Sequence, residues 1–189
     1  MFLADILFKK PYDKVFIPPI SFRNMSTTRT LLDNQKIKYT GTFDLGDAYK
    51  HLHDWLTARR FSLAESKYKE KLKGDLREFE IEWVATKEVD EYSKYEINTT
   101  FIIMVKDVKA EVDGETKTRQ QGLIELYITV NLVLDREDNW ESTPYIKFFK
   151  TFYEKYLYRG TIENMEGELW NIGWAYFNEA KAYLNLYRF

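Results

Sequence analysis

The sequence EFEIEWV at residues 78–84 alternates apolar and polar side chains with a period of two. Two further stretches show the same alternation, YEINTTFIIMV at residues 95–105 and IELYITVNLVL at residues 124–134. This pattern is typical of β-strands that bury one face. Between the last two stretches, Asp113-Gly114 favours a tight hairpin turn, because both central residues of that turn type need a positive φ. We therefore expect about four antiparallel strands in a meander over residues 78–134.

Helical spacing appears on both sides of this predicted sheet. Asp44 is placed to cap the start of a helix, and the apolar residues that follow at helical spacing are Leu45, Ala48, Leu52, Trp55 and Leu56. Thr143-Pro144 is typical of another helix start, with Gly160 at its end. A last helix is predicted from about Asn164 to near the end of the chain. The sequence thus predicts an α+β fold with one N-terminal helix and two aromatic-rich C-terminal helices packed on the sheet.

Residues 1–41 differ in composition from the rest of the chain. They contain three of the four prolines, Pro11, Pro18 and Pro19. Proline fixes φ and pushes the preceding residue toward extended geometry. We expect an extended apolar arm and loop over residues 1–41, followed by a single α+β domain over residues 42–189.

The charge of the chain is nearly balanced. Its 189 residues include 28 lysines and arginines and 30 aspartates and glutamates, for a net charge of −2. Without a basic cluster, nucleic-acid binding is not expected. The N-terminal apolar run is shorter than the about 20 residues of a membrane span and lacks the basic segment of a secretory signal. We expect a cytoplasmic protein, or a virion component if the source is viral.

The residue types that carry most enzyme chemistry are scarce. There is no cysteine, and His51 and His53 are the two histidines. Two positions apart on a helix, they point in different directions; Asp47 with His51 could form a metal pair, but exposed helix residues are the favoured interpretation. Glu80 and Glu82 share one strand face, as a catalytic carboxylate pair or an ordinary solvated face would. The sequence favours a non-catalytic protein, and it predicts no cofactor and no metal site.

Aromatic residues make up 17 % of the chain, and such side chains are enriched at protein interfaces. The first functional hypothesis is therefore a structural or interaction subunit that binds copies of itself or other subunits of an assembly. The residues expected at its interfaces are Phe2, Leu3, Ile6, Leu7, Phe8, Phe16 and Ile17 in the arm, and Trp170, Trp174, Phe177 and Phe189 near the C-terminus.

A second hypothesis is a binding module for an apolar small ligand. A curved antiparallel sheet wrapped around a helix can leave an aromatic-lined cavity between them. The residues expected to line it are Trp83, Phe101, Tyr127 and Tyr176, which could equally fill a solid core.

Overall fold

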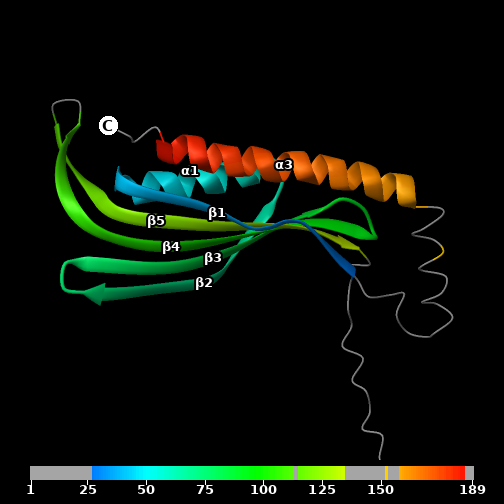
Figure 1. Ribbon diagram of the computed structural model, residues 1–189, viewed down its shortest axis with the longest axis horizontal. Helices are drawn as coiled ribbons and strands as arrows, with labels where there is room; N and C mark the ends of the chain where they lie inside the picture. The colour runs from blue at the N-terminus through cyan, green and yellow to red at the C-terminus, as the bar shows by residue number, and fades with distance from the viewer. Residues whose placement is uncertain (1–26, 113–114, 135–151, 153–157, 186–189) are drawn as a thin grey trace, which may run out of the picture.

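A computed structural model of the protein describes residues 27–112, 115–134, 152 and 158–185. Five strands form one sheet, and two helices lie on one of its faces (Figure 1). In chain order the elements are β1 (Thr27–Phe43), α1 (Leu45–Ala58), β2 (Ser62–Lys73), β3 (Leu76–Glu88), β4 (Ser93–Val112), β5 (Glu115–Leu134) and α3 (Arg159–Asn185). The α+β class predicted from the sequence is confirmed.

The sheet is antiparallel throughout and has the strand order β1-β5-β4-β3-β2. Strands β3, β4 and β5 form the predicted meander. Val112 pairs with Glu115, so the β4–β5 connection falls at the predicted position, residues 113–114. The predicted meander region holds three strands rather than about four, and β1 and β2, which precede it in the sequence, add an edge on each side to make five.

Strand β1 was predicted as part of a loop, and the structure corrects this. Its pairing with β5 shifts register twice between Thr30 and Gln35, and Asn34 has a φ of 48°. Such a bulge interrupts the period of two on which strand prediction depends. After the bulge the alternation is regular, and Ile37, Tyr39 and Phe43 are buried.

Strand β2 was missed because it has almost no apolar face. Its sequence SLAESKYKEKLK is exposed at most positions, and within the described part of the chain it pairs only with β3. An edge strand rich in lysine is a common protection against pairing with other chains. The same charges remove the apolar signal that would have predicted the strand.

The helices agree in part with the prediction. The carboxylate of Asp44 accepts a hydrogen bond from the backbone N–H of Asp47 at 2.9 Å, which confirms the predicted cap of α1. Helix α3 starts earlier than expected, so Gly160 lies in its first turn rather than at the end of a preceding helix. The first of the two C-terminal helices lies almost wholly outside the described residues. Among the residues that are described, no helix is long and apolar enough to cross a membrane.

The core lies between the helices and one face of the sheet. Its largest fully buried side chains include Trp83, Tyr95, Tyr176, Phe43, Leu56, Ile97 and Ile103. Helix α3 approaches the sheet closely at Gly173, where a Cβ would lie 2.8 Å from Leu32 and 3.0 Å from Val130. The close approach places α3 over β1 and β5, and α1 lies beside it.

The sheet curves toward the helices at the end that carries the β4–β5 connection (Figure 1). Strands β4 and β5 approach closely at Gly122, where a Cβ would lie 2.0 Å from the carbonyl oxygen of Met104. Only glycine allows so close an approach between strands. The bend turns the outer parts of β4 and β5 toward the beginning of α1, where a groove is found.

Candidate functional site

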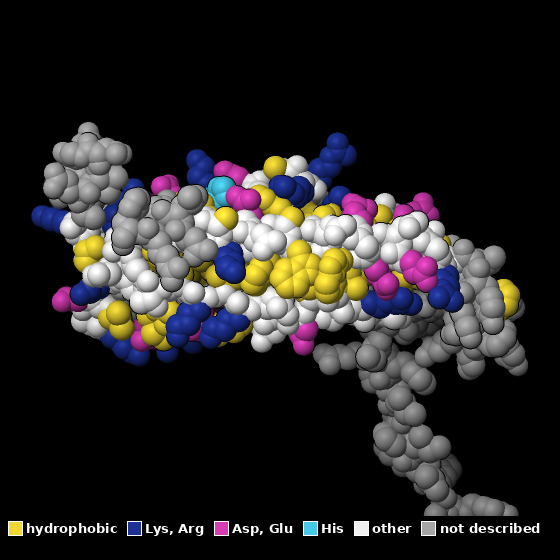
Figure 2. All heavy atoms as spheres, turned by 45° about the horizontal axis from the view of Figure 1, so that its top comes forward, with side chains coloured by type: hydrophobic (Ala, Val, Ile, Leu, Met, Phe, Trp, Pro, Cys, Tyr) yellow, Lys and Arg dark blue, Asp and Glu magenta, His cyan; other side chains and the backbone are white. Residues whose placement is uncertain are grey.

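The first candidate site is a row of aromatic side chains on one side of α3, Trp170, Trp174 and Phe177, which we call the aromatic flank. The rings of Trp170 and Trp174 meet edge to face with centres 5.9 Å apart, and those of Trp174 and Phe177 do so at 5.4 Å. Trp170 is 45 % exposed, whereas Trp174 and Phe177 are partly buried against the core. Figure 2 looks onto the helical side of the molecule and shows hydrophobic side chains gathered near its centre.

The aromatic flank lies on the side of α3 that faces the edge strand β1. Arg29 of β1 donates to Glu166 of α3 at 2.8 Å, one helical turn before Trp170. Further along α3, a small hollow of about 160 Å³ lies between the two elements and is lined by residues that include Phe177, Lys181 and Ile37. Within the described residues β1 pairs only with β5, so its outer edge lies next to these aromatic rings.

The structure thus brings together three of the four C-terminal interface residues predicted from the sequence, Trp170, Trp174 and Phe177. The predicted arm residues, Phe2, Leu3, Ile6, Leu7, Phe8, Phe16 and Ile17, lie outside the described residues, and so does Phe189. Their part in an interface stays a prediction.

The second candidate site is a groove of about 510 Å³ at the beginning of α1, which we call the α1 groove. Strands β4 and β5 each have 20 residues, whereas helix α1 has 14. The two strands therefore continue past the first turn of α1 and leave the groove open there. Its lining residues are Asp44, Leu45, Gly46, Tyr49, Tyr68, Arg77, Phe79, Ile81, Thr118 and Gln120. They come from α1 and its cap, β2, β3 and β5, which are far apart in the sequence, so sequence analysis gave no signal for this groove.

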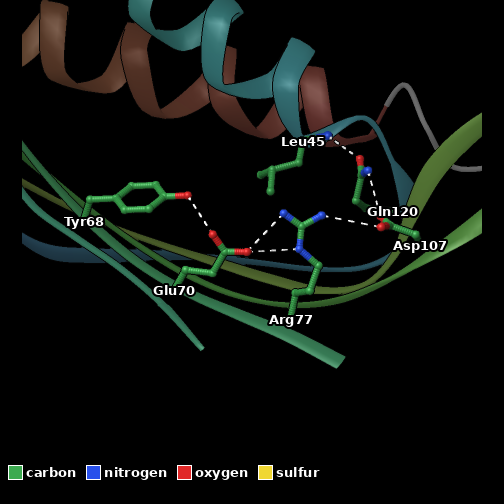
Figure 3. Close-up of polar contacts among 6 residues, drawn as sticks. All are labelled: Leu45, Tyr68, Glu70, Arg77, Asp107 and Gln120. Atoms are coloured by element: carbon green, nitrogen blue, oxygen red, sulfur yellow. Dashed lines mark hydrogen bonds and ion pairs between the residues drawn. The ribbon is translucent and has the colours of Figure 1, made fainter. Parts of the chain in front are cut away.

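Arg77 is the centre of the polar contacts at the α1 groove (Figure 3). Its Nε and Nη2 donate to one oxygen of Glu70 at 3.2 and 3.1 Å, and its Nη1 donates to Asp107 at 3.5 Å. Gln120 donates to the other oxygen of Asp107 at 3.2 Å and accepts from the backbone N–H of Leu45 at 3.0 Å. These contacts tie the first residue of α1 to four strands, β5, β4, β3 and β2.

Two tyrosines stand at the rim of the α1 groove, each held by a carboxylate. Tyr49 donates to Glu65 at 2.7 Å, and Tyr68 donates to Glu70 at 3.3 Å. Two causes raise the pKa of Tyr49: partial burial has the larger effect, and the hydrogen bond to Glu65 adds to it. The same two causes raise the pKa of Tyr68, with Glu70 as its neighbour. Both phenols are therefore protonated donors at neutral pH.

The histidines do not form a metal site with Asp47. His51 Nε2 lies 2.7 Å from Glu179 of α3, and the His51 ring stacks on Tyr183 with centres 4.6 Å apart. His53 lies on another side of α1, 3.2 Å from Asp54. No group of three potential metal ligands occurs within the described part of the chain.

Glu80 and Glu82 share a strand face as predicted, and a cation lies between them. Lys67 Nζ donates to Glu80 at 2.6 Å and to Glu82 at 3.0 Å. The bond from Lys67 lowers the pKa of Glu80. A general acid needs a raised pKa, so this arrangement matches a surface ion cluster.

The residues expected to line an internal cavity are placed differently from the prediction. The rings of Trp83 and Phe101 are in contact, with centres 4.7 Å apart, and both are buried. Tyr176 is buried and accepts a hydrogen bond from Thr99 at 3.3 Å. Tyr127 alternates with buried Leu126 and Ile128 and so lies on the opposite face of the sheet. Tyr127 therefore cannot line one cavity together with the other three residues, and the α1 groove is a ligand-sized space near α1.

Comparisons of this chain with models of known protein families, with curated proteins and with solved structures found no match. The function is therefore inferred from the aromatic flank and the α1 groove.

Proposed function

We propose that this protein is a non-catalytic structural or interaction subunit of a larger protein assembly. It docks through an N-terminal arm and through the aromatic flank of α3, and its partners are copies of itself or other subunits. The observation that carries the proposal is the row of edge-to-face rings that ends in the exposed Trp170, next to the edge strand β1.

Both the chemistry and the position of the aromatic flank support this proposal. Tryptophan is enriched among the residues that dominate binding energy at interfaces, where it is surrounded by contacts that exclude water. Phe177 and Trp174 are held against the core, so the row is already ordered before a partner binds. A pre-ordered surface loses less side-chain entropy on association. The ion pair of Arg29 with Glu166 provides a polar rim at one end of the row.

The test is the mass of the full-length protein in solution, measured by light scattering at two concentrations. We expect an oligomer for the wild type and a lower mass for Trp170→Glu, because a charge in the aromatic flank would be buried in the interface. Met104→Glu is the matched control, since Met104 is 40 % exposed and lies on the other face of the sheet. An oligomer unchanged by Trp170→Glu would remove the aromatic flank from the interface, and a wild-type monomer would contradict self-assembly.

The role of the arm is tested separately. Deletion of residues 1–22 leaves every described strand and helix in place, so the domain should remain folded while its mass falls. Circular dichroism checks the fold and light scattering the mass. If the shortened chain unfolds as a monomer, the arm belongs to the core of its own domain.

The second candidate function, a binding module for an apolar small ligand, is favoured by the α1 groove. Its volume of about 510 Å³ lies within the range of small-molecule sites. Its walls combine apolar side chains with a few polar groups, which is the usual make-up of such sites. Binding of an uncharged amphiphile such as 1-octanol, measured by titration calorimetry, tests this candidate.

A further inference from the structure

The chemistry of the α1 groove indicates what kind of ligand it would take. Its apolar walls are Leu45, Phe79 and Ile81, with Tyr49 and Tyr68 at the rim. Tyr68 is 55 % exposed, so its ring is available to a ligand in the groove. An aromatic face carries a negative potential and attracts cations.

The groove already holds one internal cation in this way. The guanidinium of Arg77 lies over the ring of Phe79, 5.0 Å from its centre, and contacts the carboxylates of Glu70 and Asp107. The combination of an aromatic ring with carboxylates is the arrangement that proteins use to bind organic ammonium groups. Arg77 shows that the surroundings of the groove stabilise a large, weakly hydrated cation.

Acidic groups outnumber basic ones around the groove. Among the described residues that line it or bond to its lining, the carboxylates are Asp44, Asp47, Glu65, Glu70 and Asp107, and the cations are Arg77 and Arg119. Lys109, two residues beyond Asp107 on the same face of β4, leaves the acids in excess. The potential in the groove therefore favours a positively charged ligand.

We propose that the α1 groove binds a small organic cation with an apolar body, such as an alkyltrimethylammonium compound. Its apolar body lies along Leu45, Phe79 and Ile81, and its cationic head lies against Tyr68 near Glu65 and Glu70. The proposal rests on the second candidate function and is independent of the aromatic flank.

A carboxylate ligand fits less well. To reach Arg77 it would have to displace Glu70, whose oxygen accepts two hydrogen bonds from that guanidinium. It would also lie close to Asp107, which bonds to the same side chain. Like charges at such distances cost binding free energy. The groove is therefore selective by charge, with the order cation, neutral compound, anion.

The experiment compares three ligands that share one alkyl chain, octyltrimethylammonium, 1-octanol and octanoate. Binding to the full-length protein is measured by titration calorimetry at low salt and below the concentrations at which the ligands aggregate. We expect the dissociation constant of octyltrimethylammonium to be about tenfold lower than that of 1-octanol, since a cation–π contact with nearby carboxylates contributes on this scale. Octanoate should bind most weakly.

Two variants locate the binding in the groove. Tyr68→Leu keeps an apolar side chain but removes the ring, so it should weaken octyltrimethylammonium about fivefold and change 1-octanol little. Glu70→Gln leaves Arg77 with one carboxylate fewer. It should therefore weaken the binding of octyltrimethylammonium and strengthen the binding of octanoate. The matched control is Glu78→Gln, because Glu78 bonds to Lys73 at 2.8 Å on the other face of the sheet.

Each outcome has a separate meaning. If 1-octanol binds but octyltrimethylammonium binds no more tightly, the groove is an apolar site and the proposed cation selectivity is wrong. If octanoate binds most tightly, Arg77 recognises anions and the proposal is overturned. If none of the three binds, both this proposal and the second candidate function fail. Equal effects of Glu70→Gln and Glu78→Gln would place the binding outside the groove.

Discussion

The two sides of helix α3 have different surroundings. One side meets α1, where Trp55 contacts Tyr176 with ring centres 5.2 Å apart and His51 reaches Glu179. The other side carries the aromatic flank, and no described element covers Trp170. Both sides are rich in aromatic residues, yet among the described elements only one side is covered by a neighbouring helix.

This difference shows that aromatic content alone does not tell core from interface. Tyr176 lies in the centre of the buried stripe of α3, whereas Trp170 lies about 100° away from Leu169 around the helix. The position of α1, set by its short connection to β1, decides which side is covered. The side that no described element covers is the one proposed to bind a partner, and its exposed Trp170 should matter little for the stability of the isolated domain.

The largest effect is expected for Tyr176→Ala. Tyr176 is fully buried and bonds to Thr99, so its loss leaves a cavity and an unpaired hydroxyl. We expect the free energy of unfolding to fall by about 3–5 kcal/mol. Trp170→Ala is the matched variant on the other side and should cost about 1 kcal/mol, since its ring contacts Trp174 at the surface. Urea unfolding of both variants measures the contrast, and equal losses would contradict it.

The next largest effect is expected for Gly173→Ala, which should lower the free energy of unfolding by about 2–3 kcal/mol. The added methyl group would lie 2.8 Å from Leu32 and 3.0 Å from Val130, so α3 must move away from the sheet. Gly167→Ala, in the same helix, is the control. It meets nothing within 4 Å and should stabilise the protein by up to about 1 kcal/mol, because alanine favours helix. Thermal unfolding of the two variants should therefore shift in opposite directions.

The sequence predicted the parts of the fold in which side-chain periodicity is regular. Strand β3 alternates regularly, β4 and β5 do so over most of the predicted stretches, and α1 has both a capping residue and a buried stripe. Strand β1 was missed because a bulge near Asn34 breaks its period. Strand β2 was missed because an edge strand covered with lysine and glutamate lacks an apolar face.

The two candidate sites differ in the same way. The aromatic flank consists of residues three and four apart on one helix, so its row could be predicted from spacing alone. The α1 groove is formed by side chains of α1 and its cap, β2, β3 and β5, which only the folded sheet brings to one place. Tyr68 belongs to the strand that was not predicted. A site that depends on tertiary curvature leaves no local signal in the sequence.

The third prediction concerns the contact that holds the start of α3 against the loop between β3 and β4. Asp90 accepts hydrogen bonds from the backbone N–H groups of Tyr92 at 2.9 Å and Ser93 at 2.6 Å, and another from the hydroxyl of Tyr158, just before α3. Burial opposes ionisation of Asp90, but these bonds outweigh it and lower the pKa of the carboxyl group. We expect Asp90→Asn to cost about 1–2 kcal/mol at pH 7.

The pH dependence separates this role from simple packing. Because the folded pKa lies below the unfolded value, the stabilisation is complete above about pH 5 and is lost as pH falls below about 4. The difference between wild type and Asp90→Asn should therefore shrink at low pH in urea unfolding. Asp75→Asn, in the exposed β2–β3 turn, is the control and should leave the pH profile unchanged. A constant difference at all pH values would contradict the role assigned to the carboxylate.

The smallest effect is expected where α1 meets α3 at the surface. His51 is 39 % exposed, and its contacts with Glu179 and Tyr183 are the outermost between the two helices. Partly exposed pairs of this kind contribute up to about 1 kcal/mol, so His51→Ala should lower the free energy of unfolding by less than about 1 kcal/mol. His53→Ala, two residues along, removes a bond within α1 and a distant edge contact with Trp83, with ring centres 6.4 Å apart, and should also cost less than about 1 kcal/mol. If His51→Ala instead cost as much as Tyr176→Ala, the side of α3 that meets α1 would depend on polar contacts at the surface as much as on buried side chains. The contrast between the two sides of α3 could then no longer be explained by core packing.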